Sequence, residues 1–396
     1  MTTVLSRSFS NFFDSEKASA IVLIACTVFC LLVANSASGP AYQQFWQTYL
    51  AGMSLEHWVN DALMAVFFLL IGLELERELY VGELSSLKNA LLPIFAALGG
   101  IIVPAGIHFA LNSGTPTQAG SGIPMATDIA FALGALSLLG SRIPASLKVF
   151  LTATAVMDDL GAIIVIAVFY STKFSLGYLL GALAVYLVLV LCNRLLRVMA
   201  LTPYLLGGAV MWLLMVKSGV HATIAGVLLA FAIPFSSQAE DEKSPSHRLE
   251  HFLHKPVAFV VLPLFALANT AVVFAPQWQQ SLGSANSLGI IAGLVLGKPL
   301  GIALLSYLAV AAGICRLPAD LTWPHIIGVG LLGGIGFTMS IFITNLAFAD
   351  QMQIINASKM AILMASLAAA TLGLFWLSLH SRKPHLSNEI VGDASP

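Results

Sequence analysis

Twelve apolar runs, separated by short polar connections, dominate the sequence. About 20 apolar residues are enough to cross the hydrocarbon core of a bilayer as an α-helix. Backbone polar groups in lipid must be satisfied within the spanning segment, so the pattern predicts an all-α polytopic membrane protein with twelve transmembrane helices in one domain, residues 1–396. The runs are Ala18–Ala34, Trp58–Leu73, Ala90–Leu111, Ile123–Leu139, Leu147–Tyr170, Leu176–Cys192, Tyr204–Val216, Val220–Phe235, Val257–Phe274, Leu288–Ile314, Ile326–Phe348 and Ala357–Leu379.

The composition agrees with insertion into a lipid bilayer. Hydrophobic residues make up 58% of the chain and charged residues only 9%, whereas about a quarter of the residues in a soluble domain are charged. A net charge of -1 excludes binding of nucleic acid through bulk charge. The four cysteines lie in or beside apolar runs without metal-binding spacing, so we interpret them as packing residues and expect no bound cofactor.

The basic residues predict the orientation, because cytoplasmic loops collect Lys and Arg. If the N-terminus is cytoplasmic, 14 of the 18 basic residues lie at cytoplasmic ends, and the C-terminus and the loop 236–255 are cytoplasmic as well. The 14 residues are Arg7, Lys17, Arg77, Lys88, Arg142, Lys148, Arg194, Arg197, Lys243, Arg248, Lys255, Arg316, Arg382 and Lys383.

Two adjacent carboxylates, Asp158 and Asp159, lie in the middle of the fifth run. Each ionised Asp at the bilayer centre costs roughly 2.5 to 3.5 kcal/mol on insertion scales, so a pair there requires a functional reason. Successive helical side chains diverge by about 100°, which predicts that one carboxylate contacts a protein partner and the other faces water. Carboxylate oxygens are hard ligands for small cations, and adjacent acids titrate as a coupled unit. The pair therefore predicts exchange of protons for a cation.

Lys298, in Gly297–Gly301, is the basic residue inside the tenth run. Charges inside the membrane usually pair with one another or line a pathway, so we expect Lys298 to pair with one Asp of the fifth run or to carry a proton. A purely structural salt bridge between two helices is the alternative.

Two of the runs contain residues that break helices. The fourth contains Pro124, Thr127 and Asp128, and the eleventh contains Gly333, Gly334 and Gly336. Unwound backbone at membrane depth survives only where protein or a water-filled cavity satisfies it. We expect Asp128 to offset the positive N-termini of the half-helices, Lys298 to offset their negative C-termini, and Thr127 with freed carbonyls to ligate a cation. Close packing of helices is the alternative for the glycines.

The two interrupted runs occupy matching places in the chain. One is the middle of the three runs in residues 90–170, and the other is the middle of the three runs in residues 288–379. This placement predicts two inverted repeats and a pair of crossing broken helices. That arrangement indicates secondary transport with a site at the midplane.

Further titratable residues lie nearer the membrane surfaces. Glu74 ends the second run on the cytoplasmic side, and Glu250, His251 and His254 lie in or next to the long cytoplasmic loop. We expect them to collect cations and respond to pH, with a plain solvated loop as the alternative. His221, near the outer face, is either a packing residue or a further pH-responding group.

The chain resembles the NhaA family of sodium/proton antiporters along nearly its whole length. The stretches that carry the resemblance are Asn60–Glu78, Ala126–Gly134, Asp158–Ile163, Lys217–Gly226, Arg248–His254, Gly297–Gly301 and Gly333–Ile343. This family is an established example of inverted repeats and broken helices.

The resemblance implies a protein of the bacterial inner membrane that extrudes Na+ or Li+ from the cytoplasm in electrogenic exchange for protons, with activation at alkaline pH. It implies that Asp158 and Asp159 bind the cation and protons, with Thr127 nearby and Lys298 paired with Asp158. It places Glu74, Glu250, His251 and His254 in the pH-responding region.

Two features depart from the family pattern. Family members can form homodimers through a hairpin between the first two spans, but Trp46–Glu56 is short and has little strand alternation. Glu76 is an acid where a basic residue is expected, which implies a shifted pH response.

Three other functions share parts of this pattern. An intramembrane aspartyl protease needs its two acids on separate helices, which adjacent aspartates cannot supply. A passive cation channel is opposed by the fixed positive charge of Lys298. A sodium-coupled symporter also uses broken helices, but it needs a larger substrate pocket that no part of the sequence identifies.

Overall fold

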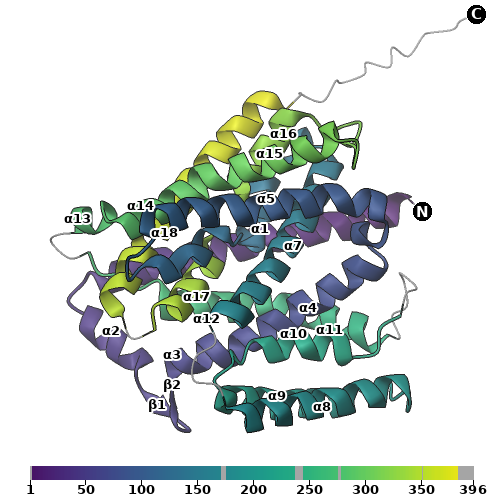
Figure 1. The fold of residues 1–396 in the computed structure, drawn as a ribbon, viewed down its shortest axis with the longest axis vertical. Coiled ribbons are helices and arrows are strands. Elements are labelled where there is room, and N and C mark those ends of the chain that lie inside the picture. Colours follow the sequence, from purple (N-terminus) through teal and green to yellow (C-terminus); the bar gives the residue numbers. More distant parts are fainter. Residues whose placement is uncertain (1, 171–174, 237–243, 275–277, 350, 382–396) are drawn as a thin grey trace, which may run out of the picture.

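The computed structural model describes residues 2–170, 175–236, 244–274, 278–349 and 351–381. Most of its long helices run between the same two ends of the molecule (Figure 1). They are α1 (Thr2–Ala34), α4 (Met64–Tyr80), α5 (Leu87–Asn112), α7 (Ala145–Phe169), α8 (Leu176–Arg194), α9 (Leu201–Ser218), α15 (Lys298–Ala311) and α18 (Met352–His380).

Shorter elements connect or extend these helices. The α-helices among them are α2 (Gly39–Trp46), α3 (Leu55–His57), α6 (Ile129–Ser137), α10 (Ile224–Ala232), α11 (Pro245–Pro256), α12 (Leu262–Asn269), α13 (Trp278–Leu282), α14 (Ala285–Ala292), α16 (Trp323–Gly333) and α17 (Phe337–Ala347). The 3-10 helices are η2 (Glu83–Ser85), η3 (Gln118–Met125) and η4 (Gly140–Arg142), and the π-helical turns are η1 (Trp58–Leu63), η5 (Val257–Val261) and η6 (Gly293–Gly297). The strands are β1 (Tyr49–Leu50) and β2 (Met53–Ser54).

Within the described residues, ten helices are long and apolar enough to cross a membrane, and eleven if the bent pair α16 and α17 forms one span. This confirms the polytopic all-α fold. The predicted run without a full-length helix is Val220–Phe235, where α10 has only nine residues. The chain leaves helical geometry at Gly219, whose φ is 79°, and again at Ile233. Ile233 precedes Pro234, which disfavours helical geometry in the residue before it.

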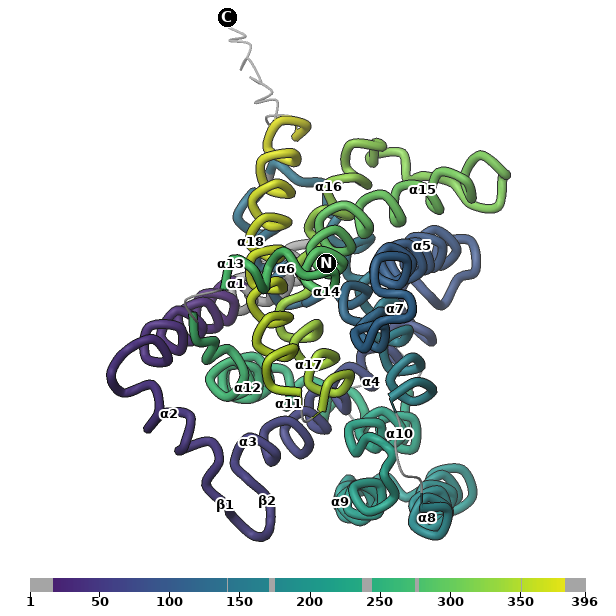
Figure 2. Tube along the Cα trace, turned by 60° about the vertical axis from the view of Figure 1, so that its left-hand side comes forward, coloured from purple at the N-terminus to yellow at the C-terminus, as the bar shows by residue number. Residues whose placement is uncertain are grey.

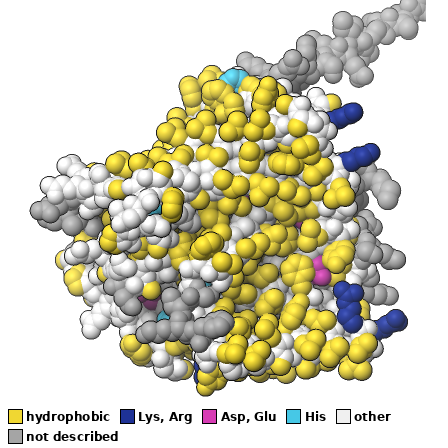
Figure 3. Space-filling model, in the orientation of Figure 1, with side chains coloured by type: hydrophobic (Ala, Val, Ile, Leu, Met, Phe, Trp, Pro, Cys, Tyr) yellow, Lys and Arg dark blue, Asp and Glu magenta, His cyan; other side chains and the backbone are white. Residues whose placement is uncertain are grey.

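The lipid-facing character of the surface is clearest at α8 and α9. These helices lie side by side at the lower edge of the molecule in both views (Figures 1 and 2). Only 11% of the apolar window of α8 and 28% of that of α9 are buried. Hydrophobic side chains also cover much of the face drawn in Figure 3. Exposed apolar area on this scale indicates contact with lipid rather than water.

The segment between α2 and α3 forms a short hairpin. Tyr49 pairs with Ser54 and Leu50 with Met53 in an antiparallel ladder, and Ala51 and Gly52 make the turn with positive φ values of 51° and 89°. A two-residue turn with both φ values positive suits the twist of a hairpin. The strands project away from the helices (Figure 2), so a hairpin forms here despite the weak strand alternation.

The stretch predicted as the loop 236–255 is partly helical. Residues 237–243 lie outside the described residues, but α11 begins at Pro245 and continues through η5 into α12. Pro245 occupies the first helical position, where its missing N–H costs nothing. Leu249 and Leu253 are spaced by one turn and are both buried. The high polarity of the segment therefore reflects one exposed helix face rather than a loop.

Candidate functional site

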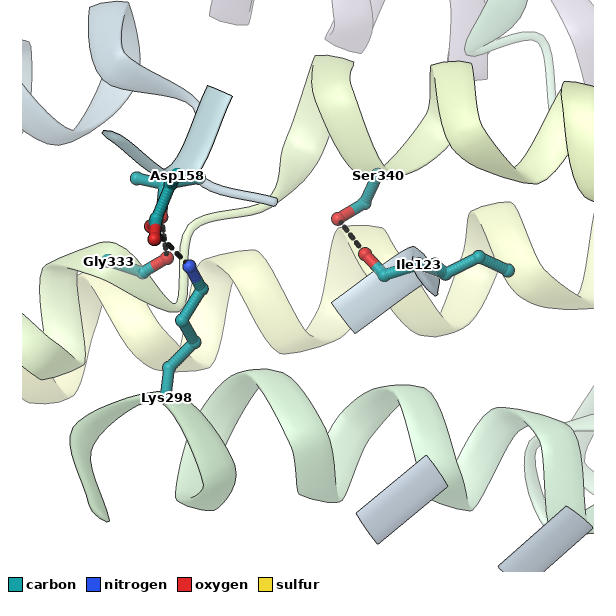
Figure 4. Close-up of polar contacts among 6 residues, drawn as sticks. Ile123, Asp158, Lys298, Gly333 and Ser340 are labelled. Carbon is teal, nitrogen blue, oxygen red and sulfur yellow. Dashed lines mark hydrogen bonds and ion pairs between the residues drawn. The ribbon is translucent and has the colours of Figure 1, made fainter. Parts of the chain in front are cut away.

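The two aspartates of α7 lie deep in the helical bundle, each with only 1% of its surface exposed. Asp158 Oδ2 lies 2.5 Å from Lys298 Nζ and accepts a hydrogen bond from Thr127 Oγ1 at 2.7 Å. Lys298 itself is fully buried. Figure 4 shows Lys298 reaching from its helix toward Asp158 beside the Gly333 carbonyl. The lysine and the aspartate expected to pair are thus in direct contact.

The local sequence explains how Lys298 reaches this position. The π-helical turn η6 ends at Gly297, and Lys298 is the first residue of α15. Glycine at position 297 allows close packing, because a Cβ there would lie 2.8 Å from Pro104 Cα on α5. A π-helical turn rotates the residues that follow it relative to a regular helix. The lysine side chain is thereby turned into the bundle.

Asp159 has a different environment from Asp158. It lines a cavity of about 100 Å³ together with Asp128, Glu74, His254 and Thr338. Its Oδ1 atom is buried and has no hydrogen-bond partner among the described residues. A buried carboxylate oxygen without a partner is costly, so an oxygen of this kind is suited to a cation, a proton or water. One carboxylate of the pair contacts a protein cation and the other borders a cavity, as the helical spacing predicts.

The two broken segments cross next to the aspartate pair. Between η3 and α6 the chain is extended at residues 126–128, and α16 and α17 are bent by 48° at their break. The backbone N–H of Asp128 donates to Ile335 O at 2.7 Å, which joins the two breaks directly. Ser340 Oγ donates to Ile123 O at 2.8 Å (Figure 4), so the end of η3 is tied to α17 as well.

Asp128 caps two half-helices at this crossing. Its Oδ1 accepts from the backbone N–H of Phe131, in the first turn of α6, at 3.0 Å. Its Oδ2 accepts from the backbone N–H of Thr338, in the first turn of α17, at 3.1 Å and also from the Thr338 hydroxyl. A carboxylate at a helix N-terminus satisfies orphan N–H groups and stabilises the positive end of the helix dipole.

We expect Asp128→Ala to lower stability because both caps are lost. Each cap is worth about 1 to 2 kcal/mol, so the combined loss is about 2 to 4 kcal/mol, with a smaller loss for Asp128→Asn. Thermal unfolding in detergent measures the difference. Ser284→Ala is the control, since Ser284 caps only the N-terminus of α14. Equal losses for Asp128→Ala and Ser284→Ala would contradict the double-cap assignment.

Thr127 lies where the two breaks meet the aspartate pair. Its Oγ1 is within hydrogen-bonding distance of both Asp158 Oδ2, at 2.7 Å, and Gly333 O, at 2.9 Å. A hydroxyl has one proton, so it can donate to only one of these acceptors at a time. Hydroxyl, carbonyl and carboxylate oxygens therefore lie close together at Thr127. Oxygens of these kinds are the ligands that small hard cations prefer.

The chain is similar to known proteins along nearly its whole length. The family model described as Na+/H+ antiporter 1 matches residues 10–377. The Na+/H+ antiporter NhaA of Dechloromonas aromatica is 74% identical over 95% of this chain and 97% of its own length.

The chain belongs to the NhaA family of Na+/H+ antiporters.

Other NhaA relatives are similar over equally large parts of the chain. The protein named NhaA from Cytophaga hutchinsonii is 58% identical over 98% of this chain and 99% of its own length. The protein named NhaA from Flavobacterium psychrophilum is 59% identical over 97% of each chain. Members of the NhaA family are secondary transporters, so the protein is an integral membrane transporter and not an enzyme.

The residues predicted to respond to pH are only partly brought together. Glu74 and His254 line the cavity at Asp159, and Glu250 Oε1 lies 3.1 Å from Arg77 Nε. His251 is on the exposed side of α11. His221 lies away from this group, where its Nε2 is 2.8 Å from Tyr170 O at the end of α7.

One residue of the site, Thr338, was not predicted from the sequence; it shares the cap of α17 with Asp128. Glu76, which was singled out for the pH response, is buried, with an oxygen 3.4 Å from Ser246 Oγ. Thr338 could have been identified as a hydroxyl directly after the glycines of a broken run. The sequence did not predict that Glu76 is buried, because the segment that contains Ser246 was interpreted as a loop.

Proposed function

We propose that the protein extrudes Na+ or Li+ from the cytoplasm in exchange for protons, at a site formed by Asp159, Asp158 and Thr127. The observation that carries the proposal is the unpartnered buried oxygen of Asp159 at the wall of a cavity, next to an Asp158 already held by Lys298. Asp159 is thus available to a cation that enters the cavity, and Asp158 is the second carboxylate within reach.

Lys298 makes cation binding and the ion pair compete. A cation that takes Asp158 as a ligand needs the oxygen that Lys298 contacts, and the two positive charges repel each other at this distance. Protons on the carboxylates likewise compete with the cation. Two carboxylates and one ammonium group hold more proton positions than one cation replaces, so we propose an electrogenic exchange.

The orientation follows from the distribution of basic residues. In Figure 3 most of the visible Lys and Arg side chains lie at one edge of the molecule, which is also the end that carries the N-terminus in Figure 1. Cytoplasmic ends of membrane proteins are enriched in Lys and Arg. We therefore propose a protein of the bacterial inner membrane with both termini in the cytoplasm.

The proposed pH response involves the contact between α4 and α11. The ion pair of Arg77 with Glu250 joins these helices, and Glu74 and His254 lie at the neighbouring cavity. A change in the charge of any of these groups alters the field at the cavity entrance, because the charges are only partly screened there. We propose that this contact adjusts cation access as pH changes.

Exchange is tested with the purified protein in acid-loaded vesicles that contain a lumenal pH dye. We expect Na+ and Li+ to raise the lumenal pH, and K+ to have no effect. An imposed membrane potential that changes the rate supports electrogenic exchange, and an unchanged rate contradicts it. A folded protein that gives no response to Na+ between mildly acidic and alkaline pH would overturn the proposed function.

A further inference from the structure

A second cavity, of about 730 Å³, lies beside the cytoplasmic half of α7 in the proposed orientation. Its wall includes Asn89 and Pro93 of α5, Phe150 and Ala153 of α7, and Arg316 after α15. The cavity at Asp159 is lined instead by Thr152 and Val156 of α7. Helical residues are about 100° apart, so Phe150 and Ala153 are centred roughly 100° around α7 from Thr152 and Val156. Two separate cavities therefore border different faces of α7.

Thr154 follows Ala153 of the second cavity's wall and precedes Asp158 by about one turn of α7. It is 2% exposed, and its Oγ1 has no hydrogen-bond partner among the described residues. Thr27 and Thr344 behave differently, because each donates its hydroxyl to the carbonyl four residues earlier in its own helix. An unpartnered buried hydroxyl is unfavourable unless another group satisfies it.

The free oxygen of Asp158 can share a partner with Thr154. Asp158 Oδ1 is also buried without a partner in the described part of the chain. Residues four apart on a helix have Cβ atoms about 5 to 6 Å apart, and helical side chains lean toward the N-terminus, so the Asp158 carboxylate extends toward Thr154. A single water molecule hydrogen-bonded to both oxygens would satisfy them.

Ser306 adds a third unpartnered oxygen from the facing helix α15. It is fully buried and its Oγ lacks a partner among the described residues. It follows Ile302 by one turn, and a Cβ built at Gly100 of α5 would lie 3.1 Å from Ile302 and 3.5 Å from Asp158 Oδ1. Helices α5, α7 and α15 therefore meet at Gly100. From Gly100 toward the start of α5, the helix carries the small buried residues Ala97 and Ala96 and then Pro93, which lines the second cavity.

We propose that Thr154 and Ser306 line a narrow hydrated passage from the second cavity to Asp158, separate from the cavity that reaches Asp159. The ligand of these hydroxyls is water, held in a chain that satisfies three otherwise unpartnered oxygens. The role of this passage rests on the proposed function: the passage gives each carboxylate of the exchange site its own access to water. Its hydration can be measured without any transport assay.

The test uses thiol accessibility in a protein whose four native cysteines are replaced by serine. Thr154→Cys and Ser306→Cys are each exposed to Ag+, which is small enough to follow a chain of water and reacts with thiolates. Blocked thiols are measured as lost maleimide labelling after denaturation. Ala153→Cys, at the cavity wall, shows that the probe enters, and Thr27→Cys is the matched buried control. We expect both test thiols to be blocked at least tenfold faster than Thr27→Cys.

A second measurement compares variants that keep the side-chain volume. Thr154→Val removes the hydroxyl, and we expect a roughly five- to tenfold lower maximal exchange rate, the order expected for one lost hydrogen bond, with recovery in Thr154→Ser. Thr27→Val should leave the rate unchanged. The passage would be overturned if both test thiols react no faster than Thr27→Cys while Ala153→Cys reacts and exchange persists. That result would leave the proposed function standing. Loss of the proposed function would appear instead as an unaffected Asp159→Asn variant.

Discussion

Replacing Asp159 by Asn is expected to abolish Na+-driven alkalinisation of acid-loaded vesicles. The substitution keeps the size of the side chain but removes the ionic oxygen that borders the cavity without a partner. Loss of a charged ligand of this kind is worth about 3 kcal/mol, which corresponds to a roughly 100-fold or larger fall in exchange at low Na+. Lumenal pH during the first seconds after addition of Na+ measures the rate.

Asp61→Asn is the matched control for this experiment. Asp61 is the same residue type in a spanning segment, but it pairs with His57 at 2.9 Å and its side chain is 25% exposed. It does not line the cavity at Asp159. We expect its exchange rate to remain within about twofold of the wild type, as for surface ion pairs. An Asp159→Asn protein that folds and keeps more than half of the wild-type rate would remove Asp159 from the site.

The Asp158 and Lys298 contact should appear as a strong energetic coupling. Lys298→Met alone leaves a buried carboxylate without its cation, and such losses cost about 3 to 5 kcal/mol of stability. The double variant with Asp158→Asn removes both charges, so we expect most of the stability to return even though exchange is lost. Thermal unfolding of the wild type, both single variants and the double variant in detergent gives the coupling.

Lys359→Met serves as the comparison for the lysine change. Lys359 of α18 is also buried, at 7% exposed, but has no ion-pair partner among the described side chains. Its replacement removes a buried charge without leaving another one behind, so we expect little loss of stability. If the stability losses of Lys298→Met and Asp158→Asn simply add in the double variant, the contact between Asp158 and Lys298 is not energetically coupled.

Much of the fold and the centre of the site could be predicted from residue spacing. The apolar runs predicted most spans, and the breaks at Pro124 and at Gly333–Gly336 predicted the interrupted helices. The adjacency of Asp158 and Asp159 predicted their different environments, because helix geometry fixes the angle between them. These features depend on local sequence, which a single chain displays directly.

Features that depend on contacts between distant segments could not be predicted. The helical character of α11 was hidden, because its polar residues occupy one exposed face and only Leu249 and Leu253 show the buried one. The shortening of α10 needed the conformation of Gly219 as well as Pro234. The unpartnered hydroxyl of Thr154 has no signature in sequence, since a threonine in a helix usually bonds to its own backbone.

The crossing of the two broken segments constrains how the protein can move. Asp128 bonds to Ile335 through its backbone and caps both α6 and α17 through its side chain, and an unpaired backbone N–H at membrane depth would be costly. The two half-helices therefore cannot slide past each other without breaking several buried hydrogen bonds at once. Any switch of access between the two sides of the membrane must carry the crossing as one rigid body and place its hinges elsewhere in the chain.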